Sequence, residues 1–397
     1  MGRGRAALVM PRRRAIVTTL ALLVAGCSPA ARTTARPESE FLLVSDDSTA
    51  WVHTSADTVV VQRAPLLVAT LAGRLIEVYV ADDAINFDDA TFLVGRIFRR
   101  DLVSGDSTLV YADSSVLREA MAYVRAHPDA ERLEEDEPVP NGVRAFESSI
   151  TPLDVIGGTI SLEVHLDRTV GELGTHDTYR ATVDLQTGRR MALADVIAPA
   201  AARLSIATAH HNLAAAIALA DRRDGPVGRA ASRAISALRF DSLSFSLSRS
   251  GDSLAAQFLA HDEQVIDEGR DTHRFALEPI QLAPPLWWSS ARRVLPRQLP
   301  DSSVQFDVGR IALDVKYDSQ DVGQVAAHST GGARAVTRMR GPVRRAIAVG
   351  DSLIAPAGQW RRALERAFSE SGYYSEQVRA ASLRSRARPT AARQAAL

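Results

Sequence analysis

Two copies of the tetrapeptide Gly-Asp-Ser-Leu carry serines that could act as nucleophiles. They stand at residues 350–353, directly after an apolar run, and at residues 251–254. A serine nucleophile needs a base, usually a histidine that an aspartate orients. No histidine follows Ser352, and no Asp-x-x-His occurs in the chain. Because Gly-Asp-Ser is also a common turn composition, we expect turns at both places and no catalytic residue.

Two groups of side chains could bind a metal ion. His210 and His211 are adjacent on an expected helix, where neighbours point about 100° apart, whereas two ligands on one helix favour i, i+4 spacing. We expect His210 to be a partly buried, hydrogen-bonded histidine. The acidic run 134–137 lacks the ligand pattern of a calcium loop. No metal or cofactor is therefore expected, and a solvated loop is expected for the second group, His261, Asp262, Glu263, Asp271 and His273.

The tryptophan pair Trp287 and Trp288 follows two prolines and could bind a ligand. Adjacent residues on an extended segment point to opposite faces, so one ring could be exposed. Exposed aromatic rings are common binding elements for glycans and proteins. Alternatively, both rings cap hydrophobic cores at a domain junction. Both tryptophans are candidate ligand-binding residues.

The N-terminus has the three parts of a secretory signal. Arg3, Arg5 and Arg12–Arg14 precede an apolar run at residues 15–25 that is too short to span a membrane. Val24-Ala25-Gly26-Cys27 then resembles the lipobox of bacterial lipoproteins. The resemblance implies cleavage before Cys27 and lipidation of its sulfur.

The single cysteine of the chain is Cys27, so a disulfide cannot form within the chain. Several acyl chains on this residue would give a stable anchor. In the lipoprotein family a serine after the cysteine, here Ser28, does not retain the protein in the inner membrane. We expect a cell-envelope protein that is anchored to the outer membrane and faces the periplasm.

Composition limits the class of partner. The 397 residues hold 47 basic and 47 acidic side chains, and 46% of the residues are hydrophobic. Without the five arginines of the signal, 42 basic side chains oppose 47 acidic ones, a charge near −5. This mild acidity argues against a nucleic-acid partner.

The patterns of the chain predict an α+β fold. Short Val- and Ile-rich runs at 41–112, with a hairpin turn at Ser104–Asp106, predict antiparallel strands, and residues 114–127 predict a helix. Helices are expected near 199–221, 227–238 and 360–368. The expected parts are a signal peptide (1–26), a tether (27–39), an antiparallel β region with one helix (40–135), a central α+β domain (136–290), a small C-terminal α+β part (291–380) and a disordered tail (381–397).

One alternative division stays open. The C-terminal strands could complete the N-terminal sheet, which would place both parts in one domain.

The segment Thr159–Pro199 resembles the extracellular domain of lysozyme-sensing anti-sigma factors, related to domains beside peptidoglycan deacetylases. Gly174-Thr175-His176 stands where the family has Gly-Ala-His, and Asp184–Arg189 and Leu193–Ile197 match its hairpin turn and helix start. We expect Gly188 to adopt a positive φ and Asp195 to cap the helix. The resemblance covers about residues 140–285 and implies an α+β domain that binds or senses an envelope ligand, with His176 as a candidate ligand-binding residue.

These observations predict a membrane-anchored envelope lipoprotein. We expect a non-catalytic binding or sensing module for a protein or cell-wall ligand. One alternative is an envelope hydrolase that uses the Gly-Asp-Ser-Leu serine. Another is a purely structural envelope protein.

Overall fold

The chain has the α+β fold expected from its sequence, rich in antiparallel strands. The computed structural model describes residues 39–45, 48–54, 58–133, 144–222, 226–250, 253–261, 264–266, 274–288, 297–298, 304–308, 311–317, 323–328, 334–339, 343–349, 359–370 and 376–381. All described residues belong to one compact unit, Pro37–Leu397. No helix among them is long and apolar enough to cross a membrane.

The N-terminal strands form a sheet with strands from the C-terminal part. Its order is β21-β1-β2-β3-β22, and all neighbours are antiparallel. The open alternative is therefore what the structure shows: C-terminal strands complete the N-terminal sheet. The strands are β1 (Ser39–Val44), β2 (Thr49–Thr54), β3 (Thr58–Ala64), β21 (Arg345–Val349) and β22 (Glu376–Ala381).

One helix covers this sheet. Helix α6 (Gln359–Glu370), expected from the sequence near 360–368, buries Ala363, Leu364, Ala367 and Phe368. The ring centroid of Phe368 lies 5.7 Å from that of Trp51 on β2. Burying a Leu or Phe side chain stabilises a fold by about 1.5–3 kcal/mol, so α6 contributes much of the stability of this sheet.

The largest sheet crosses the boundary that the sequence predicted at residues 135 and 136. Its order is β13-β10-β9-β8-β6-β5-β4, and β7 pairs with β6. The boundary was wrong because the strand before it, β6, pairs in parallel with the strand after it, β8. The strands are β4 (Leu67–Leu71), β5 (Arg74–Asn86), β6 (Ala90–Asp101), β7 (Ser107–Ala112), β8 (Arg144–Ile156), β9 (Thr159–Val170), β10 (Leu173–Asp184) and β13 (Gln264–Ile266).

A parallel pair needs a long crossover, and helix α1 (Ser114–Ala126) supplies part of it. Its first turn is capped by Asp113, whose carboxylate accepts from the Ser115 N–H at 2.7 Å. Val116, Ala120 and Tyr123 are its buried residues. The helix that the sequence predicted at 114–127 is therefore confirmed, and α1 packs one face onto the large sheet.

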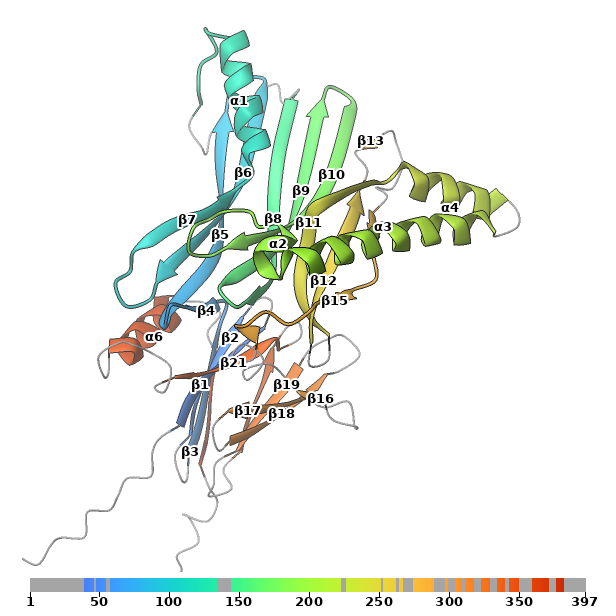
Figure 1. The fold of residues 1–397 in the computed structure, drawn as a ribbon. Coiled ribbons are helices and arrows are strands. Elements are labelled where there is room, and N and C mark those ends of the chain that lie inside the picture. Colours follow the sequence, from blue (N-terminus) through green and yellow to red (C-terminus); the bar gives the residue numbers. More distant parts are fainter. Residues whose placement is uncertain are drawn as a thin grey trace, which may run out of the picture. The chain divides into compact units, whose positions relative to one another are not determined.

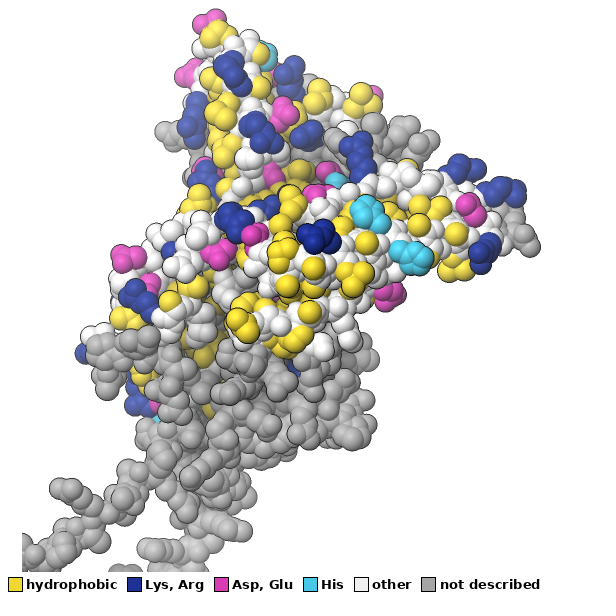
Figure 2. Space-filling view, in the orientation of Figure 1, with side chains coloured by type: hydrophobic (Ala, Val, Ile, Leu, Met, Phe, Trp, Pro, Cys, Tyr) yellow, Lys and Arg dark blue, Asp and Glu magenta, His cyan; other side chains and the backbone are white. Residues whose placement is uncertain are grey.

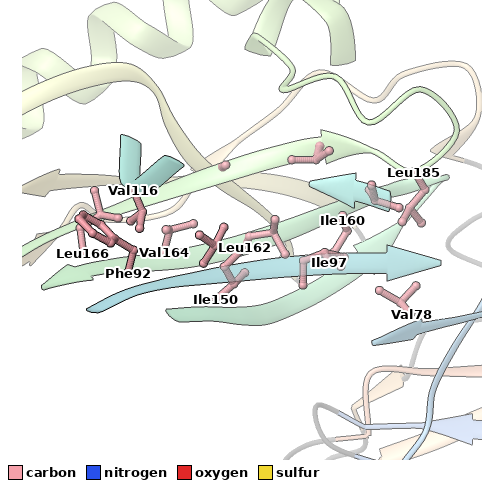
Figure 3. Close-up of a cluster of buried hydrophobic side chains, with 14 of the residues drawn as sticks. Val78, Phe92, Ile97, Val116, Ile150, Ile160, Leu162, Val164, Leu166 and Leu185 are labelled. Atoms are coloured by element: carbon pink, nitrogen blue, oxygen red, sulfur yellow. The ribbon is translucent and has the colours of Figure 1, made fainter. Parts of the chain in front are cut away.

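The core of the large sheet lies on one face of β9, where alternate residues are buried (Figure 3). Ile160, Leu162, Val164 and Leu166 point into it, and Phe92 of β6 is fully buried beside them. A strand has a period of two, so the residues between them must lie on the opposite face. Those residues are polar, and two of them, Glu163 and His165, belong to the candidate site.

Three tyrosines around this core should resist ionisation. Burial, followed by the hydrogen bond to Asp89, raises the pKa of Tyr123 to about 12, and burial also raises the pKa values of Tyr111 and Tyr179. Because the fold favours the protonated phenol, the contribution of Tyr123 to stability is complete below pH about 10 and is lost as pH rises through about 12. Titration at 295 nm should show these three of the seven tyrosines ionising late, unless unfolding comes first. Seven equal ionisations near pH 10 in the folded protein would contradict this.

The central helices and a smaller sheet enclose a second core. In Figure 1, α3 lies across β11 and β12, and α4 packs against α3. Leu254, Ala256, Phe258 and Ala260 on β12 face α3, as do Phe245 and Leu247 on β11. The elements are α2 (Leu193–Val196), α3 (Pro199–Asp221), α4 (Pro226–Ala237), β11 (Arg239–Ser250), β12 (Ser253–His261), β14 (Arg274–Ala276) and β15 (Ile280–Gln281).

The positive φ that the sequence predicted for Gly188, in the turn before α2, is confirmed, because its φ is +73°. A Cβ at this position would lie 2.5 Å from the Val110 carbonyl oxygen. The prediction for Asp195 was wrong in position. Asp195 is the third residue of α2. Its carboxylate accepts a hydrogen bond at 2.8 Å from the N–H of Ala192, the residue just before the helix.

The remaining strands form a five-stranded antiparallel sheet of order β16-β17-β18-β19-β20. Within it, β17 and β18 form an antiparallel hairpin. The predicted C-terminal part is thus divided between this sheet and the N-terminal one. The strands are β16 (Arg297–Gln298), β17 (Val304–Val308), β18 (Ile311–Tyr317), β19 (Gly323–His328) and β20 (Arg334–Met339).

A buried arginine joins the N-terminal sheet to the large sheet. Arg345 of β21 donates to the backbone oxygens of Val155 on β8 and Val68 on β4, the latter at 2.6 Å. Burial lowers the pKa of its guanidinium below the ordinary value, although the negative charge of Asp154 acts in the opposite direction. The strand that closes the N-terminal sheet is thereby bound to two strands of the other.

The two-residue turn between β4 and β5 is strained. Ala72 has a φ of +49°, and Gly73 a φ of +76°. A left-handed backbone costs a non-glycine residue about 1–2 kcal/mol. We expect Ala72→Gly to leave the fold unchanged and to raise the free energy of unfolding, by about 0.5–1 kcal/mol after the entropy cost of glycine. Urea unfolding measures this, and a lower midpoint would contradict the assigned backbone.

Candidate ligand-binding face

Three neighbouring strands present a polar grid on the face of the large sheet opposite its core. The register places Thr151, Glu163 and Arg180 in one row across β8, β9 and β10. The next rows are Ser149, His165 and Thr178, then Glu147, Asp167 and His176. Directly opposed residues in a sheet share a face, so these nine side chains form one surface. We name it the ligand-binding face.

The β8 edge of this face is open to solvent. Glu147, Ser149 and Thr151 are exposed, and the Asp167 side chain is 47% exposed. The His176 and Arg180 side chains on β10 are only 12% and 13% exposed. A ligand would therefore approach over β8 and β9, with β10 as the inner wall.

The two histidines of the face share one hydroxyl. Thr178 Oγ1 lies 3.0 Å from His176 Nε2 and 3.1 Å from His165 Nδ1. A carboxylate lies at each end, because His176 Nδ1 bonds to Asp167 and His165 Nε2 lies 3.5 Å from Glu163. The hydroxyl has one proton and donates to only one ring. The hydroxyl therefore links the two rings but can donate its proton to only one of the two inner ring nitrogens.

The inner wall of the face is fixed by β11 and β12. The Arg180 guanidinium donates to Glu163 at 3.1 Å and to Gln257 Oε1 on β12 at 2.9 Å. Its backbone N–H donates to Ser244 Oγ on β11 at 2.9 Å. Side chains held by such networks change conformation little, so the inner wall of the face is rigid.

A further ion pair lies beside the face. His261 Nδ1 on β12 is 2.8 Å from Asp177 Oδ1 on β10. Burial would raise the pKa of the Asp177 carboxyl, but the hydrogen bond and charge of His261 outweigh it and hold this pKa below its usual range. The prediction that His261 lies in a solvated loop was wrong. His261 is the last residue of β12, and its ring bonds to Asp177. Asp262, Glu263, Asp271 and His273 lie outside the described residues.

The face offers hydrogen-bond donors, acceptors and charged groups to a ligand. Its buried hydroxyl, Thr178, is 1% exposed and cannot reach a substrate as a nucleophile. Among the described residues, no group of three or more His, Cys, Asp or Glu side chains could hold a metal ion. Exposed carboxylates on Glu147 and Asp167 favour a cationic ligand.

The tryptophan pair lies in a hydrophobic core. Trp288 is 3% exposed, and Trp287 packs against the same cluster, between α3 and β12. A Cβ at Gly157 would lie 2.4 Å from the Trp287 ring. The expectation of rings on opposite faces was wrong because the chain turns here, and the Trp288 N–H donates to the Pro285 oxygen. Trp288 cannot touch a ligand without leaving this core.

The remaining predicted residues lie apart from the face. The expectation of a partly buried His210 was wrong, because both His210 and His211 are exposed on α3, where the His210 ring lies 4.1 Å from the Phe240 ring. Figure 2 shows histidine, arginine and hydrophobic side chains intermixed over α3. Ser253 pairs with Ser250 at a hairpin. Cys27, Ser352 and the acidic run 134–137 lie outside the described residues.

Sequence reasoning singled out His176 but missed its neighbours. The missed residues alternate along two strands, as Glu163-x-His165-x-Asp167 and His176-x-Thr178-x-Arg180. Polar residues at i, i+2 spacing in a strand indicate one polar face, and this signal could have found them.

Comparison with protein-family models and with curated proteins gives no match for this chain.

Proposed function

We propose that the protein is a lipid-anchored envelope protein that binds a protein or cell-wall ligand without catalysis. Three features support the proposal: the lipobox around Cys27, the resemblance of residues 140–285 to a lysozyme-sensing domain, and the ligand-binding face. The observation that carries it is the three-by-three register of polar side chains on β8, β9 and β10. Such a face offers a ligand many hydrogen bonds at once.

The charge of the face favours a basic partner. Glu147 and Asp167 reach solvent, and the mature chain is itself mildly acidic. Attraction between such charges steers the encounter and is screened by salt. Binding should therefore weaken as ionic strength rises, mainly through a slower association rate.

The anchor and the ligand need separate tests. Cys27→Ser should leave the precursor without its lipid, so a processed and membrane-bound mutant would contradict the anchor. For the ligand, the chain from Ser28 onward is titrated with lysozyme and with purified cell-wall fragments at physiological salt. Saturable binding to either is the expected result, and no binding to both would remove the proposed function.

A further inference from the structure

A second site lies where three turns of the fold meet. A cavity of about 330 Å³ is lined by the β4–β5 turn, the β6–β7 hairpin and Gln186 of the turn after β10. Ligand pockets begin at about 300 Å³, so this volume suits a small molecule. The nine polar residues of the ligand-binding face take no part in its lining.

The cavity holds two opposite charges that are available to a ligand. Arg99 of β6 and Asp106 of the hairpin line it, and neither side chain forms an ion pair or hydrogen bond with another described residue. The other two charged residues of the lining already pair with each other, because Arg74 Nε lies 2.9 Å from Asp101 Oδ2.

The position of Asp101 is fixed by its own turn. Its other carboxylate oxygen accepts from the N–H groups of Val103 and Ser104, each at 2.9 Å. The Asp101 N–H donates to the Asp106 oxygen at 2.9 Å, which closes the hairpin. Asp101 therefore shapes the cavity, and Arg99 and Asp106 remain for recognition.

Uncharged groups complete the lining. Thr108 stands opposite Arg99 in the register of β7 and β6, so its hydroxyl lies on the same face as the guanidinium. The Gln186 amide reaches the cavity from the turn after β10, and Leu71 and Ile76 supply apolar surface. A guanidinium binds a carboxylate with two parallel hydrogen bonds, and an aspartate binds an ammonium group.

We infer that this cavity binds a small zwitterion, an amino acid or the end of a short peptide. Its carboxylate binds Arg99 and its ammonium group binds Asp106. The apolar surface of Leu71 and Ile76 accepts a small side chain such as that of alanine. The site is independent of the proposed function, because its residues and its ligand are different.

Calorimetric titration of the chain from Ser28 onward with alanyl-alanine tests this site. Saturable binding is expected. Acetylating the amine or amidating the carboxylate of the peptide should each weaken binding about tenfold or more, because each removes one charged hydrogen-bond partner. Equal binding of all three peptides, or no saturation up to about 10 mM, overturns the inference.

Two variants assign the two charges. Arg99→Gln should abolish the preference for the free carboxylate, and Asp106→Asn should abolish the preference for the free amine. Arg203→Gln, an exposed arginine on α3, is the matched control and should bind as the wild type does. Thermal unfolding of each variant establishes that it is folded. A folded Arg99→Gln variant that still prefers the free carboxylate would refute the assignment.

Discussion

Deleting residues 359–397 should unfold the five-stranded N-terminal sheet. The deletion removes α6, whose Leu364 and Phe368 are fully buried, and β22, the partner of β3. Losing these two side chains and the two buried alanines should cost about 5 kcal/mol or more. Hydrogen exchange of the β1, β2 and β3 amides measures the loss.

The control deletion removes only residues 382–397 and leaves every described element in place. Its β1–β3 amides should exchange as slowly as those of the whole chain. Equal protection in both deletions would mean that the N-terminal strands form a stable sheet without the C-terminal segment. The division into separate N-terminal and C-terminal parts, which the sequence favoured, would then describe the protein better.

Phe92→Ala should be the most damaging single substitution in the large sheet. Phe92 is fully buried in β6, stacked on Phe146 at 5.4 Å between ring centroids and beside Tyr123 at 5.6 Å. Truncating a buried phenylalanine leaves a cavity and costs about 3–5 kcal/mol. Denaturant unfolding should therefore show a much lower midpoint with a similar slope.

Leu109→Ala on β7 is the matched control, because Leu109 is 50% exposed. It should change the free energy of unfolding by less than about 0.5 kcal/mol. If the two variants were equally stable, the core that Figure 3 shows would not be the main source of stability of this sheet.

Local patterns were enough to predict the helices and hairpins. The apolar pattern of residues 114–127 predicts α1, and Gly105, in the hairpin turn predicted at Ser104–Asp106, has a positive φ. The pairings β1–β21 and β6–β8 could not be predicted, because they join residues far apart in sequence and leave no periodic signal between them. The predicted domain boundary failed for this reason.

The candidate site was harder to predict than the fold. His176 was singled out only through a resemblance, and its partners Asp167 and His165 lie on another strand. Their contact depends on the register of β9 and β10, which a short turn at Gly171 sets. The turn at Trp287 and Trp288 was not predicted, because two adjacent aromatic residues do not show in sequence whether the chain is extended or turns there.

The most direct test of the proposed function is a binding titration of a variant whose ligand-binding face is blocked. Ser149→Arg with Thr151→Arg places two bulky cations on exposed positions of β8, and Ser236→Arg on the exposed end of α4 is the control. Whichever probe, lysozyme or cell-wall fragment, saturates the wild type should bind the double variant at least about tenfold more weakly and the control equally. Unchanged affinity in a folded double variant would contradict the assignment of the ligand to this face.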